Sequence, residues 1–265
     1  TFGLLKSRCY WKIMLKRNET VFGLHDTARE KSSCGVGFIT RKDGVQTHKL
    51  LEKGHEALCS VPHRGGMSAE GVGDGAGVSV DLSIEFFQKI TNTDLKAGQF
   101  GVGNFFMPNR QEQRDKACQL IASSLADSGL KILAERDIAV DNGVLRSAAI
   151  DLQLPITQWI FLAPMGISGV KFEKLIYSVL LAIESQAYTD VELDGLYPLS
   201  MSSQTQVLKG RLNSNEIIPY FKDLNDSSHS VNTLYFHTRF STNTDPHPSM
   251  AQPFRLMAHN GELNT

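Results

Sequence analysis

Short apolar runs interrupted by glycine constrain the fold of this chain more strongly than any other feature. They begin at Cys34 and are typical of β-strands, which are short and are bounded by glycine, proline and polar turns. The clearest examples are GVGFI at 35–39, AGVSVDL at 76–82, FGVGNFFM at 100–107 and AAIDLQLPI at 148–156. Later strands are predicted at 197–208, 233–240 and 254–259.

Helical patterns separate these predicted strands. One apolar stripe with helical spacing runs from Ala117 to Leu125, and a more regular one runs from Phe172 to Ile183. A weaker helix is predicted over 47–61. The order of strands and helices lacks the regular alternation of a parallel sheet. The sequence therefore predicts an α+β fold, with antiparallel sheets covered by helices.

Composition excludes several classes of function. The chain has 265 residues, of which 41% are hydrophobic, and this is enough for one sizeable core. Its 27 basic and 28 acidic residues give a formal net charge of −1, so no strong field favours nucleic acid or a membrane surface. Four cysteines lie far apart without a CxxC pair, which predicts neither a disulfide framework nor a metal site. A reducing, cytoplasmic location fits this pattern best.

The first 33 residues differ from the rest in composition and in the spacing of their apolar residues. They carry seven Lys or Arg against three acids, and their apolar residues keep no sustained period. We predict a leader over 1–33, followed by a domain over 34–265. A targeting peptide is the competing interpretation. Because the chain opens with Thr1 and stops at Thr265 without a terminating element, the domain is expected to be incomplete at its C-terminus.

Cys34 lies at the boundary between the predicted leader and the domain. A lone cysteine is commonly a small buried packing residue. Cleavage between Ser33 and Cys34 would instead free an α-amino group, with a pKa of ~7.7–8.0, beside a thiol of pKa ~8.5. Nucleophile and base would then belong to one residue. This boundary makes Cys34 the candidate nucleophile.

Two glycine-rich stretches follow, HRGG at 63–66 and GVGDGAG at 71–77. Glycines at this density permit tight turns or a close approach of the backbone to a ligand. A phosphate-binding loop is the alternative, but the required lysine and hydroxyl pattern is missing. Arg64 is the charged candidate in the first stretch.

Two motifs near the end of the chain carry further candidates. In LYFHTRFSTNT at 234–244, His237 and Arg239 alternate along a strand and so share a face. An arginine there is suited to a carboxylate, although a solvated or ion-paired arginine is the simpler interpretation. In AHNGELNT at 258–265, the Asn260 amide and the Gly261 backbone N–H are candidate oxyanion donors, and a hairpin turn is the simpler interpretation.

Taken in order, CGVGFI, HRGG followed by GDGAG, FHTRFSTNT and AQPFRLMAHNGELNT resemble the class II, N-terminal nucleophile glutamine amidotransferase domain. The longer form of the later motifs is most similar to the amino-terminal domain of glutamate synthase large chains. The resemblance covers Cys34 to Thr265. It implies a four-layer αββα sandwich of antiparallel sheets.

The resemblance also implies residue roles. Cys34 would attack the glutamine carboxamide and form a thioester, while Asn260 and Gly261 would form the oxyanion hole. Arg239 would hold the α-carboxylate of glutamine. His237 and Thr238 would shape the substrate pocket beside it, and Arg64 would border the pocket. The acidic residue that binds the α-amino group in this family would lie beyond Thr265.

In whole family members, ammonia passes to a synthase domain of the same chain, where 2-oxoglutarate is converted to glutamate. That domain carries FMN and an iron–sulfur cluster, and a small reductase subunit or ferredoxin supplies electrons. In eukaryotes a plastid is the expected location.

Three alternatives stay open: an amidotransferase with another acceptor, a catalytically silent docking domain, and a cysteine hydrolase with His63 or His259 as base. As written, Cys34 is acylated by Ser33, so activity requires cleavage.

Overall fold

Eight strands form two antiparallel sheets in the computed structural model, which describes residues 35–61, 65–238 and 253–254. The first sheet has the order β1-β8-β2-β7, with bounds Val36–Thr40, Thr233–His237, Ala76–Asp81 and Thr205–Gly210. The second has the order β4-β5-β3-β6, with bounds Lys131–Asp137, Ile156–Leu162, Phe100–Phe106 and Tyr197–Ser202. The predicted α+β class is confirmed.

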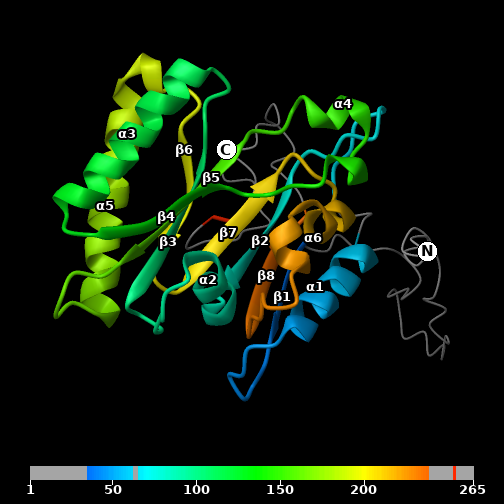
Figure 1. Cartoon of the computed structure of the whole chain (residues 1–265). Helices are drawn as coiled ribbons and strands as arrows, with labels where there is room; N and C mark the ends of the chain where they lie inside the picture. The colour runs from blue at the N-terminus through cyan, green and yellow to red at the C-terminus, as the bar shows by residue number, and fades with distance from the viewer. Residues whose placement is uncertain (1–34, 62–64, 239–252, 255–265) are drawn as a thin grey trace, which may run out of the picture. The chain divides into compact units, whose positions relative to one another are not determined.

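Helix α1 (His48–Ser60) packs along β8 and β1 of the first sheet, and the short α6 (Ile217–Tyr220) lies close to it (Figure 1). The helix approaches the sheet closely at Gly54, where an added Cβ would lie 2.6 Å from a methyl group of Leu234. The buried side chains of α1 belong to the largest apolar cluster, together with Val78 and Phe236. This packing holds β8, which carries the HTR motif at its end, in the middle of the sheet.

Helices α3 (Gln111–Asp127) and α5 (Gly169–Thr189) lie side by side against the second sheet (Figure 1). Both stripes predicted from the sequence face the core: the buried side chains are Ala117, Ile121, Leu125, Phe172, Ile176, Val179, Leu180 and Ile183. They pack with Phe105 and Trp159 of the sheet. The alternate residues of β3, such as Val102, face the other way and contact α2 (Ile84–Thr91). The sheet is therefore covered on both faces, which explains why β3 is buried throughout.

Several predicted boundaries are wrong. The run at 148–156 does not form a strand: Ser147–Ile150 is a helical turn, α4, and β5 begins only at Ile156, after Pro155. The single strand predicted at 197–208 is two strands: β6 belongs to the second sheet and β7 to the first, and Ser203 and Gln204 join them. Strand β4 and helix α2 were not predicted.

Other predictions fall outside the described residues. These are the leader over 1–33, the last two positions of the strand at 233–240, and most of the strand at 254–259. Among the helices that the structure describes, none is long and apolar enough to span a bilayer.

Candidate active site

Two candidate residues, Cys34 and Arg239, lie outside the described residues. Strands β1 and β8 bring their described neighbours, Gly35 and Thr238, together. Val36 pairs with His237, and the Thr238 backbone N–H donates to the Gly35 carbonyl over 2.8 Å. The start of β1 and the end of β8 therefore lie at the same end of the sheet (Figure 1). In the sequence, Cys34 directly precedes Gly35 and Arg239 directly follows Thr238.

His237 and Thr238 are buried, with exposed fractions of 2% and 1%. The Thr238 hydroxyl has no hydrogen-bond partner among the described residues. A buried hydroxyl without a partner costs free energy, and such groups occur where a ligand or water supplies the missing bond. Thr238 therefore has a free hydrogen-bonding atom at the position where a substrate contact was predicted.

The same end of the sheet carries a buried lysine that the sequence analysis missed. Gly77 of β2 pairs with His237 on one side and with Lys209 of β7 on the other. Residues directly opposite one another in antiparallel strands project from the same face, so Val36, His237 and Lys209 share a face around Gly77. Lys209 is 2% exposed, and its ammonium nitrogen lies 4.6 Å from the ring centroid of Phe254. Burial lowers the pKa of Lys209 to about 7.

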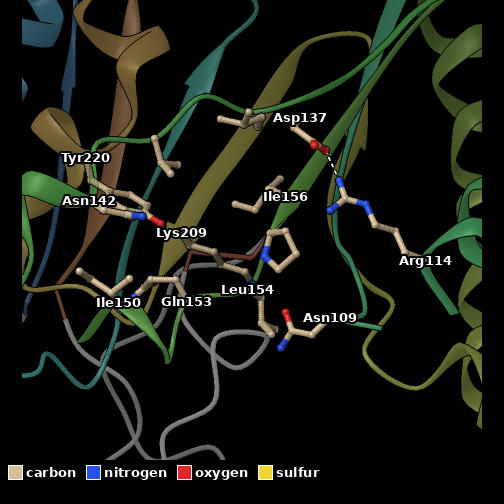
Figure 2. Close-up of a pocket in the computed structure, with 13 residues that line it drawn as sticks. Asn109, Arg114, Asp137, Asn142, Ile150, Gln153, Leu154, Ile156, Lys209 and Tyr220 are labelled. Carbon is tan, nitrogen blue, oxygen red and sulfur yellow. Dashed lines mark hydrogen bonds and ion pairs between the residues drawn. The ribbon is translucent and has the colours of Figure 1, made fainter. Parts of the chain in front are cut away.

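A cavity of about 420 Å³ opens beside Lys209 (Figure 2). Figure 2 shows the side chain of Lys209 among Asn142, Gln153 and Leu154, with Tyr220 and Ile156 nearby. An ion pair between Arg114 and Asp137 lies at its edge. Both polar and apolar side chains line this cavity.

A tight hairpin explains described glycines of the two predicted stretches, 63–66 and 71–77. The Asp74 N–H donates to the Gly66 carbonyl over 2.9 Å, and a Cβ on Gly66 would lie 1.5 Å from a carboxylate oxygen of Asp74. Gly71 has a φ of +81°, which favours glycine. A Cβ on Gly73 would lie 2.3 Å from the backbone of Leu212. Packing alone therefore accounts for these glycines, and the phosphate-loop alternative has no support here.

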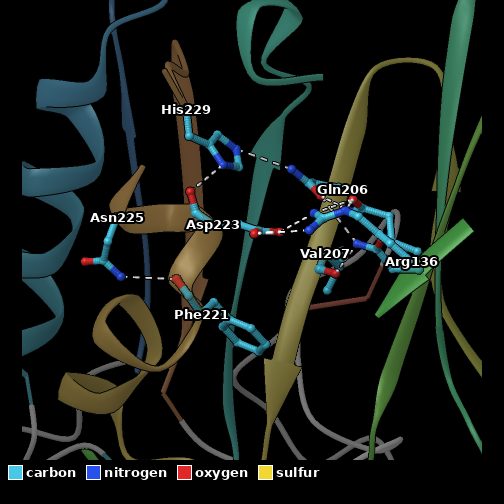
Figure 3. A network of polar contacts seen from close by, with 9 residues as sticks. Arg136, Gln206, Val207, Phe221, Asp223, Asn225 and His229 are labelled. Atoms are coloured by element: carbon cyan, nitrogen blue, oxygen red, sulfur yellow. Dashed lines mark hydrogen bonds and ion pairs between the residues drawn. The ribbon is translucent and has the colours of Figure 1, made fainter. Parts of the chain in front are cut away.

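A network of buried and partly buried polar side chains joins the two sheets (Figure 3). Arg136 of β4 forms a two-point ion pair with Asp223, one contact of which is 3.2 Å, and also donates to the Gln158 carbonyl of β5. The Gln158 amide donates to Asn104 of β3 over 2.9 Å and to Gln206 of β7 over 3.1 Å. Because β7 belongs to the first sheet and the other strands to the second, hydrogen bonds fix how the sheets meet.

His229 ends this network. Its Nδ1 lies 2.9 Å from the Asp223 carbonyl oxygen and its Nε2 lies 3.4 Å from the Gln206 side-chain nitrogen. A neutral ring that donates through Nδ1 and accepts at Nε2 satisfies both contacts. Its ring also stacks on Phe86, with centroids 4.4 Å apart. Burial lowers the pKa of His229 to about 4, with Arg136 adding to this and Asp223 opposing it.

The buried neutral His229 predicts a specific loss of stability in acid. Its pKa is lower in the folded than in the unfolded state, so the unfolded state binds the proton first. The stabilisation is therefore complete above pH ~6.5 and is lost as the pH falls toward 4. Between pH 7 and pH 5, this residue should account for about 2 kcal/mol of the unfolding free energy. Urea unfolding measures this free energy, and between pH 7 and pH 5 it should fall by about 2 kcal/mol less in the His229→Gln variant than in the wild type. An equal fall in both proteins would contradict the prediction.

The described residues include only part of the predicted site. His237 and Thr238 lie together at the end of β8. Five predicted site residues lie outside the described residues: Cys34, Arg64, Arg239, Asn260 and Gly261. The sequence analysis missed Lys209, for which the available signal was a single charged residue in the otherwise apolar run QVLKG.

Comparison with known proteins gives a consistent result. The family model of the class-II glutamine amidotransferases matches residues 34–265. The chain is 33% identical to a glutamate synthase [NADH] of Saccharomyces cerevisiae over 92% of its length, and 33% identical to a ferredoxin-dependent glutamate synthase 2 of Synechocystis over 100%. It is 32% identical to a glutamate synthase [NADPH] large chain of Bacillus subtilis over 92%. It spans only 12% to 17% of the length of these relatives.

Proposed function

The chain belongs to the class-II glutamine amidotransferases, and from that membership we propose that residues 34–265 hydrolyse glutamine to glutamate and ammonia. Cys34 is the nucleophile in this proposal, and residues 1–33 are a leader whose removal exposes its α-amino group. The match of the family model begins at Cys34, which supports this boundary.

The reaction follows from an amine and a thiol on one residue. The free α-amino group takes the proton of the Cys34 thiol, and the sulfur attacks the carboxamide carbon of glutamine. The tetrahedral oxyanion accepts hydrogen bonds from the Asn260 amide and the Gly261 N–H. The proton then passes to the departing ammonia as the carbon–nitrogen bond breaks, which leaves a γ-glutamyl thioester. Water hydrolyses the thioester and returns the thiol.

The pairing of Gly35 with Thr238 is the observation that carries the proposal. It holds the residue after the proposed nucleophile against the residue before Arg239. This supports a site in which Arg239 binds the carboxylate of glutamine and Cys34 attacks its carboxamide. The partnerless hydroxyl of Thr238 supports a polar substrate contact at the same place. His237 and Arg64 complete the proposed pocket.

The complete protein is proposed to be a glutamate synthase, since relatives from three organisms carry that name. Ammonia would pass to a synthase domain that aminates 2-oxoglutarate, with FMN and an iron–sulfur cluster bound there, and with a reductase subunit or ferredoxin as electron donor. Within the described residues, no cluster of three metal-ligating side chains occurs. A cytoplasmic or plastid location is proposed.

The mature N-terminus tests the proposal directly. Mass spectrometry of the protein purified with its natural termini should find an active form that begins at Cys34. The same preparation should release ammonia from glutamine. A glutamine-hydrolysing protein that still carries Ser33 would exclude the α-amino group as the base.

Arg239→Ala should raise the KM for glutamine strongly and leave the fold intact. The guanidinium is proposed to pair with the glutamine carboxylate, and removing one partner of a buried charge pair costs on the order of 2–5 kcal/mol. Steady-state kinetics of glutamine hydrolysis would measure the change. Arg41→Ala, at the far end of β1 where the arginine pairs with Asp43, is the matched control and should keep the wild-type KM. An unchanged KM in Arg239→Ala would remove this residue from the site.

A further inference from the structure

The cavity of about 420 Å³ beside β7 has no role in the mechanism above (Figure 2). Its volume lies within the range of about 300–1,000 Å³ that is usual for small-molecule sites. Its lining residues belong to the segments 109–156 and 209–220, which lie within the described part of the chain. Ile138, Ile150, Leu154 and Ile156 form apolar parts of its wall. Such a wall suits the apolar part of a ligand, and the polar side chains of the lining decide which polar group can accompany it.

Tyr220 brings an unpaired hydroxyl to this cavity. The residue lies in α6 and is 4% exposed, and its hydroxyl forms no hydrogen bond with another described residue. Burial raises the pKa of Tyr220 to about 12, so the phenol is protonated at neutral pH and can donate a hydrogen bond. Leaving a buried hydroxyl without a partner costs free energy. Tyr220 therefore offers a hydrogen bond to a molecule in the cavity.

Gln153 offers a second polar atom with a fixed orientation. Its amide nitrogen donates to the backbone carbonyls of Ala149 and Arg211, in both cases over 2.9 Å. These two bonds hold the side-chain amide in place, while its carbonyl oxygen has no hydrogen-bond donor among the other described residues. A carbonyl oxygen can only accept. Gln153 therefore favours a ligand that carries an N–H or O–H group.

The charged side chains of the lining are already engaged. Arg114 pairs with Asp137 at the edge of the cavity. Lys209 has interactions of its own besides its contact with the ring of Phe254, and burial lowers its pKa to about 7. A charged ligand would give up its hydration here without a counter-charge that is still unpaired among these residues. The cavity therefore suits an uncharged molecule.

We propose that this cavity binds a small uncharged molecule in which an amide group is attached to an apolar body. The amide carbonyl accepts the hydrogen bond of Tyr220, and the amide N–H donates to the carbonyl oxygen of Gln153. An amide carries this acceptor and this donor side by side, and the apolar body lies against the isoleucine and leucine side chains of the wall. The site is separate from the proposed glutamine site and does not depend on glutamine hydrolysis.

Benzamide is the probe, and isothermal titration calorimetry of the protein purified with its natural termini is the measurement. Benzamide should bind saturably, and benzoate, which has a similar shape but carries a charge, should bind at least about tenfold more weakly. Tyr220→Phe removes only the hydroxyl and should weaken benzamide binding about fivefold. Tyr188→Phe, at a tyrosine of α5 that is 93% exposed, is the matched control and should bind benzamide as the wild type does.

Two further measurements locate the bound probe. Ile150→Trp places a larger side chain in the wall of the cavity and should weaken benzamide binding at least about tenfold. Saturating glutamine should leave the affinity for benzamide unchanged, because glutamine binds elsewhere in the proposed function. Thermal unfolding of each variant separates a loss of binding from a loss of folded protein.

Four results would overturn the inference. They are no binding of benzamide, equal or tighter binding of benzoate, unchanged benzamide affinity in Tyr220→Phe, and displacement of benzamide by glutamine. A protein that binds benzamide as expected but does not hydrolyse glutamine would overturn only the proposed function, so the two failures are distinguishable.

Discussion

Replacing Cys34 with alanine should abolish glutamine hydrolysis, with a loss of turnover on the order of 10⁴-fold or more. Alanine retains the backbone at position 34 but has no sulfur to form the thioester. The remaining groups can bind glutamine and polarise its carboxamide, yet no covalent intermediate forms. Release of ammonia from glutamine is the measurement. Glutamine binding should persist in the variant, because Arg239 is proposed to hold the α-carboxylate.

Cys59 and Cys118 are the two cysteines within the described residues, and they provide matched controls. Cys59 lies 3.6 Å from a ring nitrogen of His55, so it is the competing thiol–histidine pair. Burial raises the pKa of Cys118 to about 12, so this thiol stays protonated at neutral pH. Cys59→Ser and Cys118→Ser should both retain wild-type turnover. Activity that survives in Cys34→Ala, or disappears in Cys59→Ser, would assign the nucleophile elsewhere.

Replacing Asp223 with alanine should cause the largest loss of stability, about 3–5 kcal/mol. The carboxylate is nearly buried and forms a two-point pair with Arg136, whose side chain is only 22% exposed. Without Asp223, the guanidinium stays between the sheets with Gln158 as a neutral partner. The midpoint of urea unfolding should fall accordingly, and the transition should remain cooperative.

Two further variants separate the burial of a charge from the ion pair itself. In the double variant Arg136→Met, Asp223→Leu no charge is left unpaired, so much of the lost stability should return. Glu56→Ala breaks an exposed ion pair with Lys53 on α1 and should leave the urea midpoint unchanged. If the single Asp223→Ala variant is as stable as wild type, the Arg136–Asp223 ion pair contributes nothing to the free energy of unfolding.

Much of the fold could be predicted because, in its central elements, the spacing of apolar residues in the sequence agrees with the burial of those residues in the structure. Strands β1, β2 and β3 form where apolar runs interrupted by glycine occur, and β8 forms within the run predicted at 233–240. Helices α3 and α5 bury the apolar stripes that the sequence shows. The wrong predictions occur where the local signal is mixed. The run at 148–156 is apolar enough for a strand, but Pro155 lacks an N–H and the ladder starts after it.

Strand β4 escaped prediction because it is an edge strand with charged residues. Its sequence KILAERD alternates only weakly, and Arg136 and Asp137 make their contacts with side chains distant in the sequence. Residues that meet only through strand pairing could not be predicted in the site either. Lys209 lies next to Gly77 because β2 pairs with β7, although the two residues are 132 positions apart in the sequence. No local pattern encodes such a register, whereas the motifs around Cys34 and Arg239 are contiguous in the sequence.

Strand β1 borders its sheet: within the described part of the chain, its ladder runs only to β8. Every residue in this ladder lies downstream of the proposed cleavage site. The proposed excision at the Ser33–Cys34 bond would therefore break none of these backbone hydrogen bonds, and β1 can pair with β8 both before and after the cut.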